Sequence, residues 1–143
     1  MLNITIFQGR IVNDIILEHT KGSNIPLCRL RVAVERDCLV GGERKTDFIP
    51  CVAWRDTAVF ATKYFSKGDV LTVRGRLEED VWTDTEGNKR SRIIVQAETL
   101  YFGETKRARE ERQQRRAGNA ELPPLPDDED VPPEFYDDAQ LPF

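Results

Sequence analysis

Residues Thr46–Gly75 read TDFIPCVAWRDTAVFATKYFSKGDVLTVRG, and this stretch decides the fold. Its first nine residues alternate with a period of two, as in a β-strand. One face would carry Phe48, Pro50, Val52 and Trp54, and the other would carry Ile49, Cys51 and Ala53. Both faces are apolar, although a half-buried strand should show one polar face. Phe48 and Trp54 are therefore either buried under another layer or displayed for a ligand that stacks on aromatic rings.

The rest of the stretch predicts a short helix followed by a strand. Asp56 suits an N-cap and Gly68 suits a C-terminal cap, which leaves a helix of about ten residues between them. Apolar residues recur inside it at helical spacing, at Ala58, Ala61, Tyr64 and Phe65. Val70–Leu77 then alternates as a strand, with Arg74 and Arg76 on its outward face.

Two further strand regions precede this stretch. Leu2–Leu17 is rich in β-forming residues, and Gly9 within it suggests a bulge or a sharp bend. Leu27–Glu35 alternates, and its outward residues are Arg29, Arg31, Ala33 and Glu35. We expect Asp37–Lys45 to form a loop, because it carries a Gly-Gly pair among charged residues.

After the central stretch, Glu78–Arg92 predicts a hairpin with its tip at Thr85–Asn88, and Ile93–Phe102 predicts a last strand. The order of three strands, one helix and two strands is that of an OB-fold, an all-β, five-stranded Greek-key barrel with a short helix between strands three and four. OB-folds bind ligands on strands two and three and on nearby loops. The residues expected there are Arg29, Arg31, Phe48, Trp54 and Trp82. This favours a nucleic-acid or oligosaccharide ligand over a catalytic site.

Charge divides the chain into three parts, although the net charge is only −4. Residues 1–103 are nearly neutral, with 15 basic and 14 acidic residues. Residues 104–116 hold six basic and three acidic residues, whereas residues 117–143 hold eight acidic residues and no basic one. A basic segment followed by an acidic end is typical of an interaction tail attached to a folded domain.

We expect residues 1–103 to be the folded domain, 104–133 a disordered linker and 134–143 an interaction tip. The segment after residue 103 contains helix-forming residues but no apolar stripe that would dock a helix, so we expect it to be solvated. Six of the eight prolines lie among acids between Pro123 and Pro142, which favours disorder. The final residues, EFYDDAQLPF, suit either a peptide ligand with an apolar anchor or an ordinary solvated terminus.

The cysteines and the start of the chain point to a reducing, intracellular setting. Three cysteines without a CxxC spacing and one histidine do not make a zinc site, so we expect no metal and no cofactor. These residues are Cys28, Cys38, Cys51 and His19. Charged residues interrupt the apolar run near the start, and no run approaches the ~20 apolar residues of a membrane span. We therefore expect a soluble cytoplasmic protein with no membrane contact.

At this point the residues match a family. The matching pieces are Gly9-Arg10, Leu30–Val34, Asp47-Phe48, Trp54, Tyr64–Gly68, Gly75-Arg76-Leu77, Trp82-Thr83 followed by Gly87, and the terminal Leu141-Pro142-Phe143. In this order they resemble bacterial single-stranded DNA-binding proteins over nearly the whole chain. The resemblance implies an OB-fold that forms a homotetramer, wraps single strands without catalysis near the nucleoid, and recruits replication, recombination and repair proteins through the tip.

The resemblance also implies roles for individual residues. Phe48, Trp54 and Trp82 look like the stacking aromatics, with neighbouring cations for phosphates. These cations are Arg10, Arg29, Arg31, Arg36, Arg55, Arg74, Arg76, Lys89, Arg90 and Arg92. The tip residues are Asp137, Asp138, Leu141, Pro142 and Phe143. Structural alternatives are a subunit contact for Phe48, a core position for Trp54 and hairpin packing for Trp82.

The chain departs from the family pattern in four places. The family often has an aromatic where this chain has Arg36-Asp37-Cys38, and an Asp-Pro where it has Asp14-Ile15. Pro50 cannot donate to a ladder, so its strand should be an edge or bulged there. The tip has two acids followed by Ala139-Gln140 rather than three acids. Such divergence would suit a phage, plasmid or accessory version.

Two other functions use the same features. A primosome-type or RNA-binding OB-fold adaptor would use the same face without the tail. A nuclease would need clustered carboxylates for a metal, and Glu78-Glu79-Asp80 would be split across two faces of a strand, which disfavours it.

Overall fold

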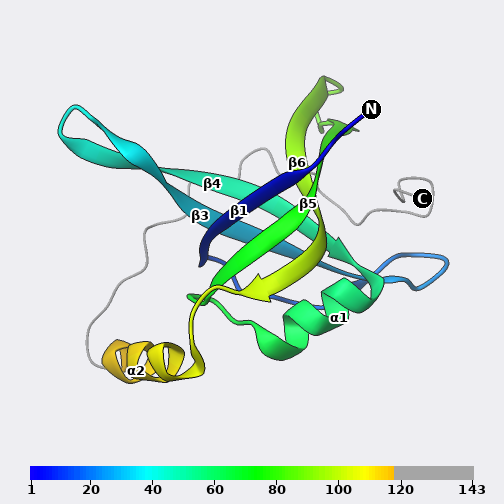
Figure 1. Cartoon of the computed structure of the whole chain (residues 1–143). Helices are drawn as coiled ribbons and strands as arrows, with labels where there is room; N and C mark the ends of the chain where they lie inside the picture. Colours follow the sequence, from blue (N-terminus) through cyan, green and yellow to red (C-terminus); the bar gives the residue numbers. More distant parts are fainter. Residues whose placement is uncertain (118–143) are drawn as a thin grey trace.

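The computed structural model describes residues 1–117, which form a closed barrel with two helices (Figure 1). The strands are β1 (Thr5–Ile11), β2 (Glu18–His19), β3 (Pro26–Val40), β4 (Glu43–Trp54), β5 (Val70–Thr83) and β6 (Lys89–Phe102), and the helices are α1 (Arg55–Tyr64) and α2 (Lys106–Arg116). The sheet order is β1-β5-β6-β4-β3-β2, and a further pairing of β1 with β3 closes the barrel. The predicted OB-fold, with its helix between the third and fourth long strands, is confirmed.

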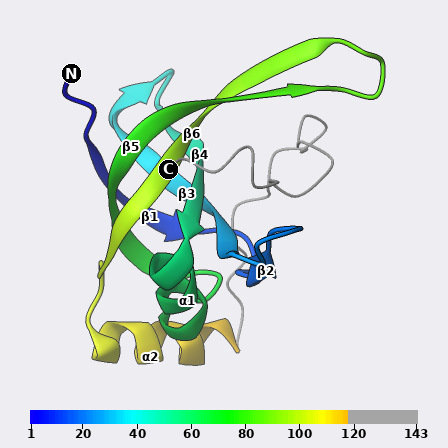
Figure 2. The same ribbon diagram turned by 90° about the vertical axis from the view of Figure 1, so that its right-hand side faces the viewer.

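The core lies inside the barrel, where apolar side chains from each long strand meet. Burial of these side chains removes apolar surface from water, which is the main stabilising contribution. The inward residues of β3 are the ones that alternation predicts, and Cys28, Leu30 and Val32 are all buried. Helix α1 lies across one end of the barrel and buries Ala58 and Ala61 against the same core (Figures 1 and 2).

Two glycines allow the barrel to close. A bulge or a sharp bend was predicted at Gly9, and the bulge is wrong, because β1 pairs with β5 in unbroken register through that residue. A Cβ atom at Gly9 would instead collide with the carbonyl oxygen of Ala33, so glycine lets β3 approach β1 closely. The bulge lies on β6, where Glu98 is the extra residue between the partners of Arg74 and Gly75. A Cβ at Gly75 would collide with the carbonyl of Gln96.

The β3–β4 hairpin projects well beyond the barrel (Figure 1). The predicted loop Asp37–Lys45 is wrong, because the strands continue to Val40 and from Glu43. Only Gly41 and Gly42 form the turn, and their φ values of 63° and 84° are those of a primed two-residue turn. Such turns match the right-handed twist of the paired strands, so a Gly-Gly pair extends this hairpin instead of ending it early.

The ends of α1 also differ from the prediction. The helix begins at Arg55 directly after β4, and the N-cap position is Trp54 rather than Asp56. Asp56 lies in the first turn, where its negative charge complements the helix dipole. The helix ends at Tyr64, before the predicted cap at Gly68, which instead takes a φ of 94° in the following loop.

The β5–β6 hairpin agrees with the sequence. The two strands pair from Leu71 to Thr83, and the arm extends away from the helical end of the barrel (Figure 2). Asp84 organises the tip, because its carboxylate accepts the backbone N–H groups of Glu86 (3.0 Å) and Asn88 (2.8 Å). These hydrogen bonds, and mainly one from the Arg90 side chain, hold the pKa of Asp84 below its ordinary value.

Helix α2 follows the barrel and contacts it. It has no apolar stripe, as the sequence indicated, but the expectation that this segment is solvated is wrong for α2, whose arginines contact the barrel through buried and half-buried carboxylates. The remainder of the expected linker and the tip, including Asp137, Asp138, Leu141, Pro142 and Phe143, lie outside the described residues. No helix within residues 1–117 is long and apolar enough to cross a membrane.

Candidate nucleic-acid interface

The outward side chains of β3 and β4 form one continuous surface. Residues directly opposite in an antiparallel pair lie on the same face of the sheet. The opposed pairs are Leu27 with Trp54, Arg29 with Val52, Arg31 with Pro50 and Ala33 with Phe48. The two arginines of β3 therefore lie beside the surface that runs from Phe48 to Trp54, as the alternation predicted.

This surface continues onto β6 and β5. Val52 is level with Gln96 in the parallel β4–β6 pair, and Gln96 is opposite Arg76 in the β5–β6 pair. Further along the arm the opposed pairs are Glu78 with Ile94, Asp80 with Arg92 and Trp82 with Arg90. We call the outward side chains of these four strands the strand face. It carries eight of the predicted site residues, which are Arg29, Arg31, Phe48, Trp54, Arg76, Trp82, Arg90 and Arg92.

Trp54 is less accessible than predicted. Its side chain is 8% exposed and packs with Leu27, Val52 and Ile94 in a small apolar cluster on the strand face. The amide of Gln96 satisfies two partners when its oxygen faces the indole N–H of Trp54 and its nitrogen faces Glu78. The prediction that Trp54 is displayed is therefore wrong within a single chain, although whether it stacks on a base stays a prediction.

A cavity of about 220 Å³ opens beside Trp54. Among the residues that line it, Val52, Trp54 and Ile94 are apolar and Glu78, Asp80 and Gln96 are polar, and all six belong to the strand face. Trp54 thus forms part of the wall of a hollow on the strand face. The sequence analysis did not include Leu27, Ile94 and Gln96 among the residues around Trp54. Their alternate positions in predicted strands could have placed them on the same face.

Trp82 and Phe48 are the more accessible aromatics, and both are half-buried. Trp82 lies on the projecting β5–β6 arm, where the guanidinium carbon of Arg92 is 5.5 Å from the ring centroid. This cation–π contact orients the ring, while Arg92 also lies 3.4 Å from Asp80. The two rings therefore lie on separate parts of the strand face, and their stacking on bases stays a prediction.

The arginines of the strand face are paired with carboxylates. Arg29 lies 3.8 Å from Glu18, and Arg90 lies 2.9 Å from Asp84. Arg76 lies 3.0 Å from Glu78 and 3.6 Å from Glu98. Such partly exposed ion pairs contribute only about 0–1 kcal/mol each, so a phosphate group can replace the carboxylate at little cost.

Five predicted cations lie elsewhere. Arg10 donates to the carbonyl of Gly68 (2.7 Å) near the helical end of the barrel. Arg36 donates two hydrogen bonds of 2.8 Å to Asp47, which lies on the other face of β4 from Phe48. These bonds lower the pKa of Asp47. The remaining three are Arg55 at the start of α1, Arg74 opposite Ile6 of β1, and Lys89 at the start of β6.

Pro50 fits the position that the sequence predicted for it. It pairs with Arg31 of β3 on one side, without a register shift. Pairing of β4 with β6 begins one residue later, at Cys51, so β4 is an edge strand at Pro50. The missing N–H of proline therefore costs no ladder hydrogen bond to β6, and the strand face remains continuous there.

The thiols of the barrel are inert. Burial raises the pKa of Cys28 and of Cys51 to about 12, so both remain protonated at neutral pH. Cys38 is exposed on the β3–β4 hairpin. Among residues 1–117, no three His, Cys, Asp or Glu side chains are grouped as metal ligands. The aromatic rings and arginines of the strand face can bind planar rings and anions through stacking and charge.

Comparison with known proteins is consistent with this geometry. The family model described as "Single-strand binding protein family" matches residues 2–103. A protein named single-stranded DNA-binding protein from Caldanaerobacter subterraneus subsp. tengcongensis is 35% identical over 107 residues, covering 74% of this chain and 71% of the relative. Single-stranded DNA-binding protein 3 of Clostridium acetobutylicum is 30% identical over 146 residues, covering 99% of this chain and all of the relative.

Proposed function

The chain belongs to the single-strand binding protein family, and we propose that it binds single-stranded DNA without sequence specificity. The observation that carries this proposal is the strand face, where Arg29 and Arg31 lie alongside the surface from Phe48 to Trp54. Every base has a π-face, so stacking on such rings gives about 1–3 kcal/mol per base regardless of sequence. Arginines replace counterions on the phosphates, which makes the affinity fall as salt rises.

We propose a binding role rather than a catalytic one. Glu78 and Asp80 share the strand face, but each is engaged by an arginine on that face. Glu79 alternates to the other side of β5, as the sequence predicted. The carboxylates of this run therefore orient cations for DNA.

We propose that the chain acts as a homotetramer in the bacterial cytoplasm, associated with the nucleoid. Support comes from apolar side chains that one chain leaves exposed on β1 and β5, among them Ile6 at 63% and Leu77 at 48%. Exposed apolar patches of this kind are typical of protein interfaces. Light scattering of the full chain should give four times the mass of one chain, and a monomeric mass would contradict this part of the proposal.

We further propose that residues 134–143 recruit replication, recombination and repair proteins. Support comes only from their sequence, which ends with acids followed by Leu-Pro-Phe. The eight acids after residue 116 should also compete with DNA for the arginines. Deleting Glu121–Phe143 should therefore tighten DNA binding at low salt and abolish capture of such partners, and a deletion without either effect would contradict both roles.

The experiment that tests the function is a competition assay. Fluorescence anisotropy of a labelled single-stranded homopolymer should rise on adding the protein, and unlabelled single-stranded DNA of any composition should compete. Duplex DNA of equal length should compete poorly, because its bases are not available to stack. An equal affinity for duplex would refute the proposal. Preferential competition by RNA would support the alternative, an OB-fold primosome or RNA-binding adaptor that uses the same face.

A further inference from the structure

Helix α2 contacts the barrel through a stripe of arginines. Arg109, Arg112 and Arg116 are half-buried, whereas the other residues of the helix are exposed. Their spacing of three and four residues places them on one face of the helix. We call these three residues the arginine stripe. No side chain of α2 is fully buried, so charge and hydrogen bonds replace the apolar face that usually docks a helix.

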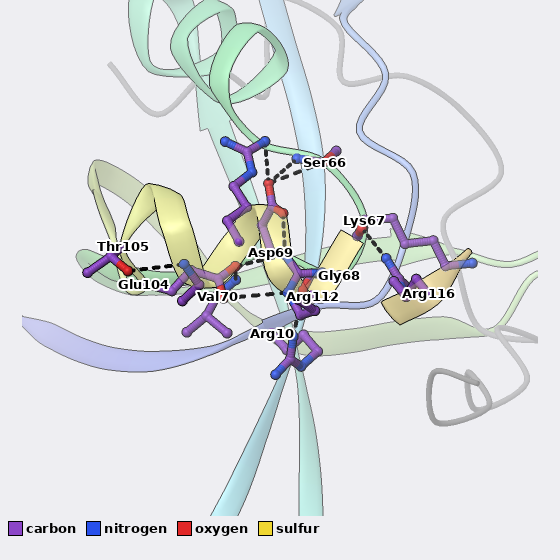
Figure 3. A network of polar contacts seen from close by, with 12 residues as sticks. Arg10, Ser66, Lys67, Gly68, Asp69, Val70, Glu104, Thr105, Arg112 and Arg116 are labelled. Carbon is purple, nitrogen blue, oxygen red and sulfur yellow. Dashed lines mark hydrogen bonds and ion pairs between the residues drawn. The ribbon is translucent and has the colours of Figure 1, made fainter. Parts of the chain in front are cut away.

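Two arginines of the stripe contact one buried carboxylate, and Figure 3 shows Arg112 beside Asp69. Asp69 is 2% exposed and lies 2.8 Å from Arg109 and 2.6 Å from Arg112. Arg112 also lies 2.7 Å from Glu104. Burial alone lowers the pKa of Arg112, but hydrogen bonds to Glu104 and Asp69 raise it above its ordinary value, so the guanidinium stays charged.

The loop that holds Asp69 is itself fixed to the barrel. The backbone N–H of Ser66 donates to the Asp69 carboxylate (2.9 Å), and the N–H of Ile11 donates to the Asp69 carbonyl (2.9 Å). Arg116 donates to the carbonyl of Lys67 (2.9 Å), as Figure 3 shows. The loop between α1 and β5 that receives α2 is therefore hydrogen-bonded to the barrel. Among the described residues, the contacts of α2 with this loop come from its arginines.

The helix depends on this contact. An isolated helix of about eleven residues is marginal in water, because nucleation is costly and few hydrogen bonds follow it. Within the described residues, the helix is otherwise supported by the Thr105 N-cap, whose side chain accepts the N–H of Ala108, and by exposed pairs. One such pair is Arg107 with Glu111 (2.9 Å), which contributes a few tenths of a kcal/mol. Folding of α2 is therefore coupled to docking on Asp69.

Arginine forks fit phosphate as well as carboxylate, with the same paired hydrogen bonds. One hydrogen-bond donor of the stripe is unused, since the buried Nε atom of Arg109 has no hydrogen-bond partner within the described chain. We propose that the arginine stripe is a second binding site for the phosphate backbone of single-stranded DNA, which Asp69 and Glu104 mask while α2 is docked. The DNA ligand of this site rests on the function proposed above.

The test uses the full chain with Asp69→Asn, which removes the charge but keeps the shape of the side chain. Asp14→Asn is the matched control, because Asp14 is exposed and the change in net charge is the same. Hydrogen exchange of residues 106–116, followed by mass spectrometry, should become at least tenfold faster in Asp69→Asn and stay unchanged in Asp14→Asn. Unchanged exchange in Asp69→Asn would refute the proposal that Asp69 holds α2 on the barrel.

The second measurement is the salt dependence of binding to a single-stranded homopolymer. Three freed arginines should steepen the slope of log K against log salt by up to about 2, from roughly 0.7 per phosphate contact. Changing all three arginines of the stripe to glutamine in the Asp69→Asn background should restore the slope of Asp14→Asn. Faster exchange with no change in slope would refute the masked site.

Two further outcomes are covered: the Asp69→Asn variant does not fold, or the unaltered protein does not bind single-stranded DNA. If Asp69→Asn does not fold, Arg112→Gln replaces it, because this change removes the 2.6 Å contact with Asp69 from the helix side. Faster exchange of residues 106–116 in Arg112→Gln than in the unaltered protein supports docking of α2 on Asp69, and equal exchange refutes it. If the unaltered protein binds no single-stranded DNA, the proposed function and the DNA ligand of the stripe both fail, while the exchange result still decides whether Asp69 holds α2.

Discussion

The two tryptophans should respond in opposite ways to truncation. Trp54 is 8% exposed and packs against Leu27, Val52 and Ile94, so Trp54→Ala removes buried apolar surface and leaves a void. Such a change in a packed site costs about 3–5 kcal/mol of unfolding free energy. A domain of this kind has about 5–15 kcal/mol in total, so the loss is a large fraction.

Trp82 lies on the projecting arm and contacts Arg92 through its ring face. Trp82→Ala should change stability by less than about 1 kcal/mol, since the arm lies outside the barrel core. It should weaken binding of single-stranded DNA by about 1–3 kcal/mol, the value of one stacked base. That corresponds to a dissociation constant roughly 5- to 150-fold higher.

Urea unfolding followed by circular dichroism measures the first quantity, and anisotropy of a labelled homopolymer measures the second. The matched controls are Trp54→Phe and Trp82→Phe, which keep an aromatic ring at each site. Each should retain most of the property that the alanine variant loses. The reasoning would be refuted if Trp82→Ala destabilised the barrel as much as Trp54→Ala, or if Trp54→Ala left the urea midpoint unchanged.

Three further predictions concern the barrel and its surface. Gly75→Ala should lower the unfolding free energy by about 1–3 kcal/mol in thermal or urea unfolding, because the new Cβ would collide with the neighbouring strand; an unchanged midpoint would contradict the bulge geometry. A thiol reagent at pH 8 should modify Cys38 rapidly, and Cys28 and Cys51 only after unfolding, because burial raises the pKa of both to about 12. Rapid modification of all three cysteines would contradict the burial of Cys28 and Cys51. Asp47 has a lowered pKa in the folded state, so its pairing with arginine stabilises the hairpin above the ordinary aspartate pKa and is lost as pH falls through the lowered value. An NMR titration of its carboxyl carbon should show that lower midpoint, and Arg36→Gln should return it to the ordinary value.

The barrel could be predicted from sequence because its strands follow simple alternation. The outward arginines of β3 and the hairpin tip near Asp84 are local features, set by period two and by turn residues. The Gly-Gly pair was read as a loop, since the sequence does not show that the flanking residues pair with each other. Pairing of Leu39 with Arg44 extends both strands to the turn.

Features that depend on distant partners could not be predicted in the same way. Alternation placed Trp54 on the correct face, but Ile94, which helps to cover it, comes from a strand far along the chain. A search for an apolar stripe could not find the docking of α2, because the stripe is made of arginines and its partner is Asp69, before β5. Arginines spaced by three and four residues were a visible signal, but their partner was not.

The central claim is that the strand face receives the bases of a single strand. The most direct measurement is the intrinsic tryptophan emission of the full chain during titration with a single-stranded homopolymer at low and high salt. Emission should be quenched to a plateau, the midpoint should move to higher DNA concentration as salt rises, and duplex DNA should cause little quenching. Unchanged emission with bound single strand, or equal quenching by duplex, would contradict the claim.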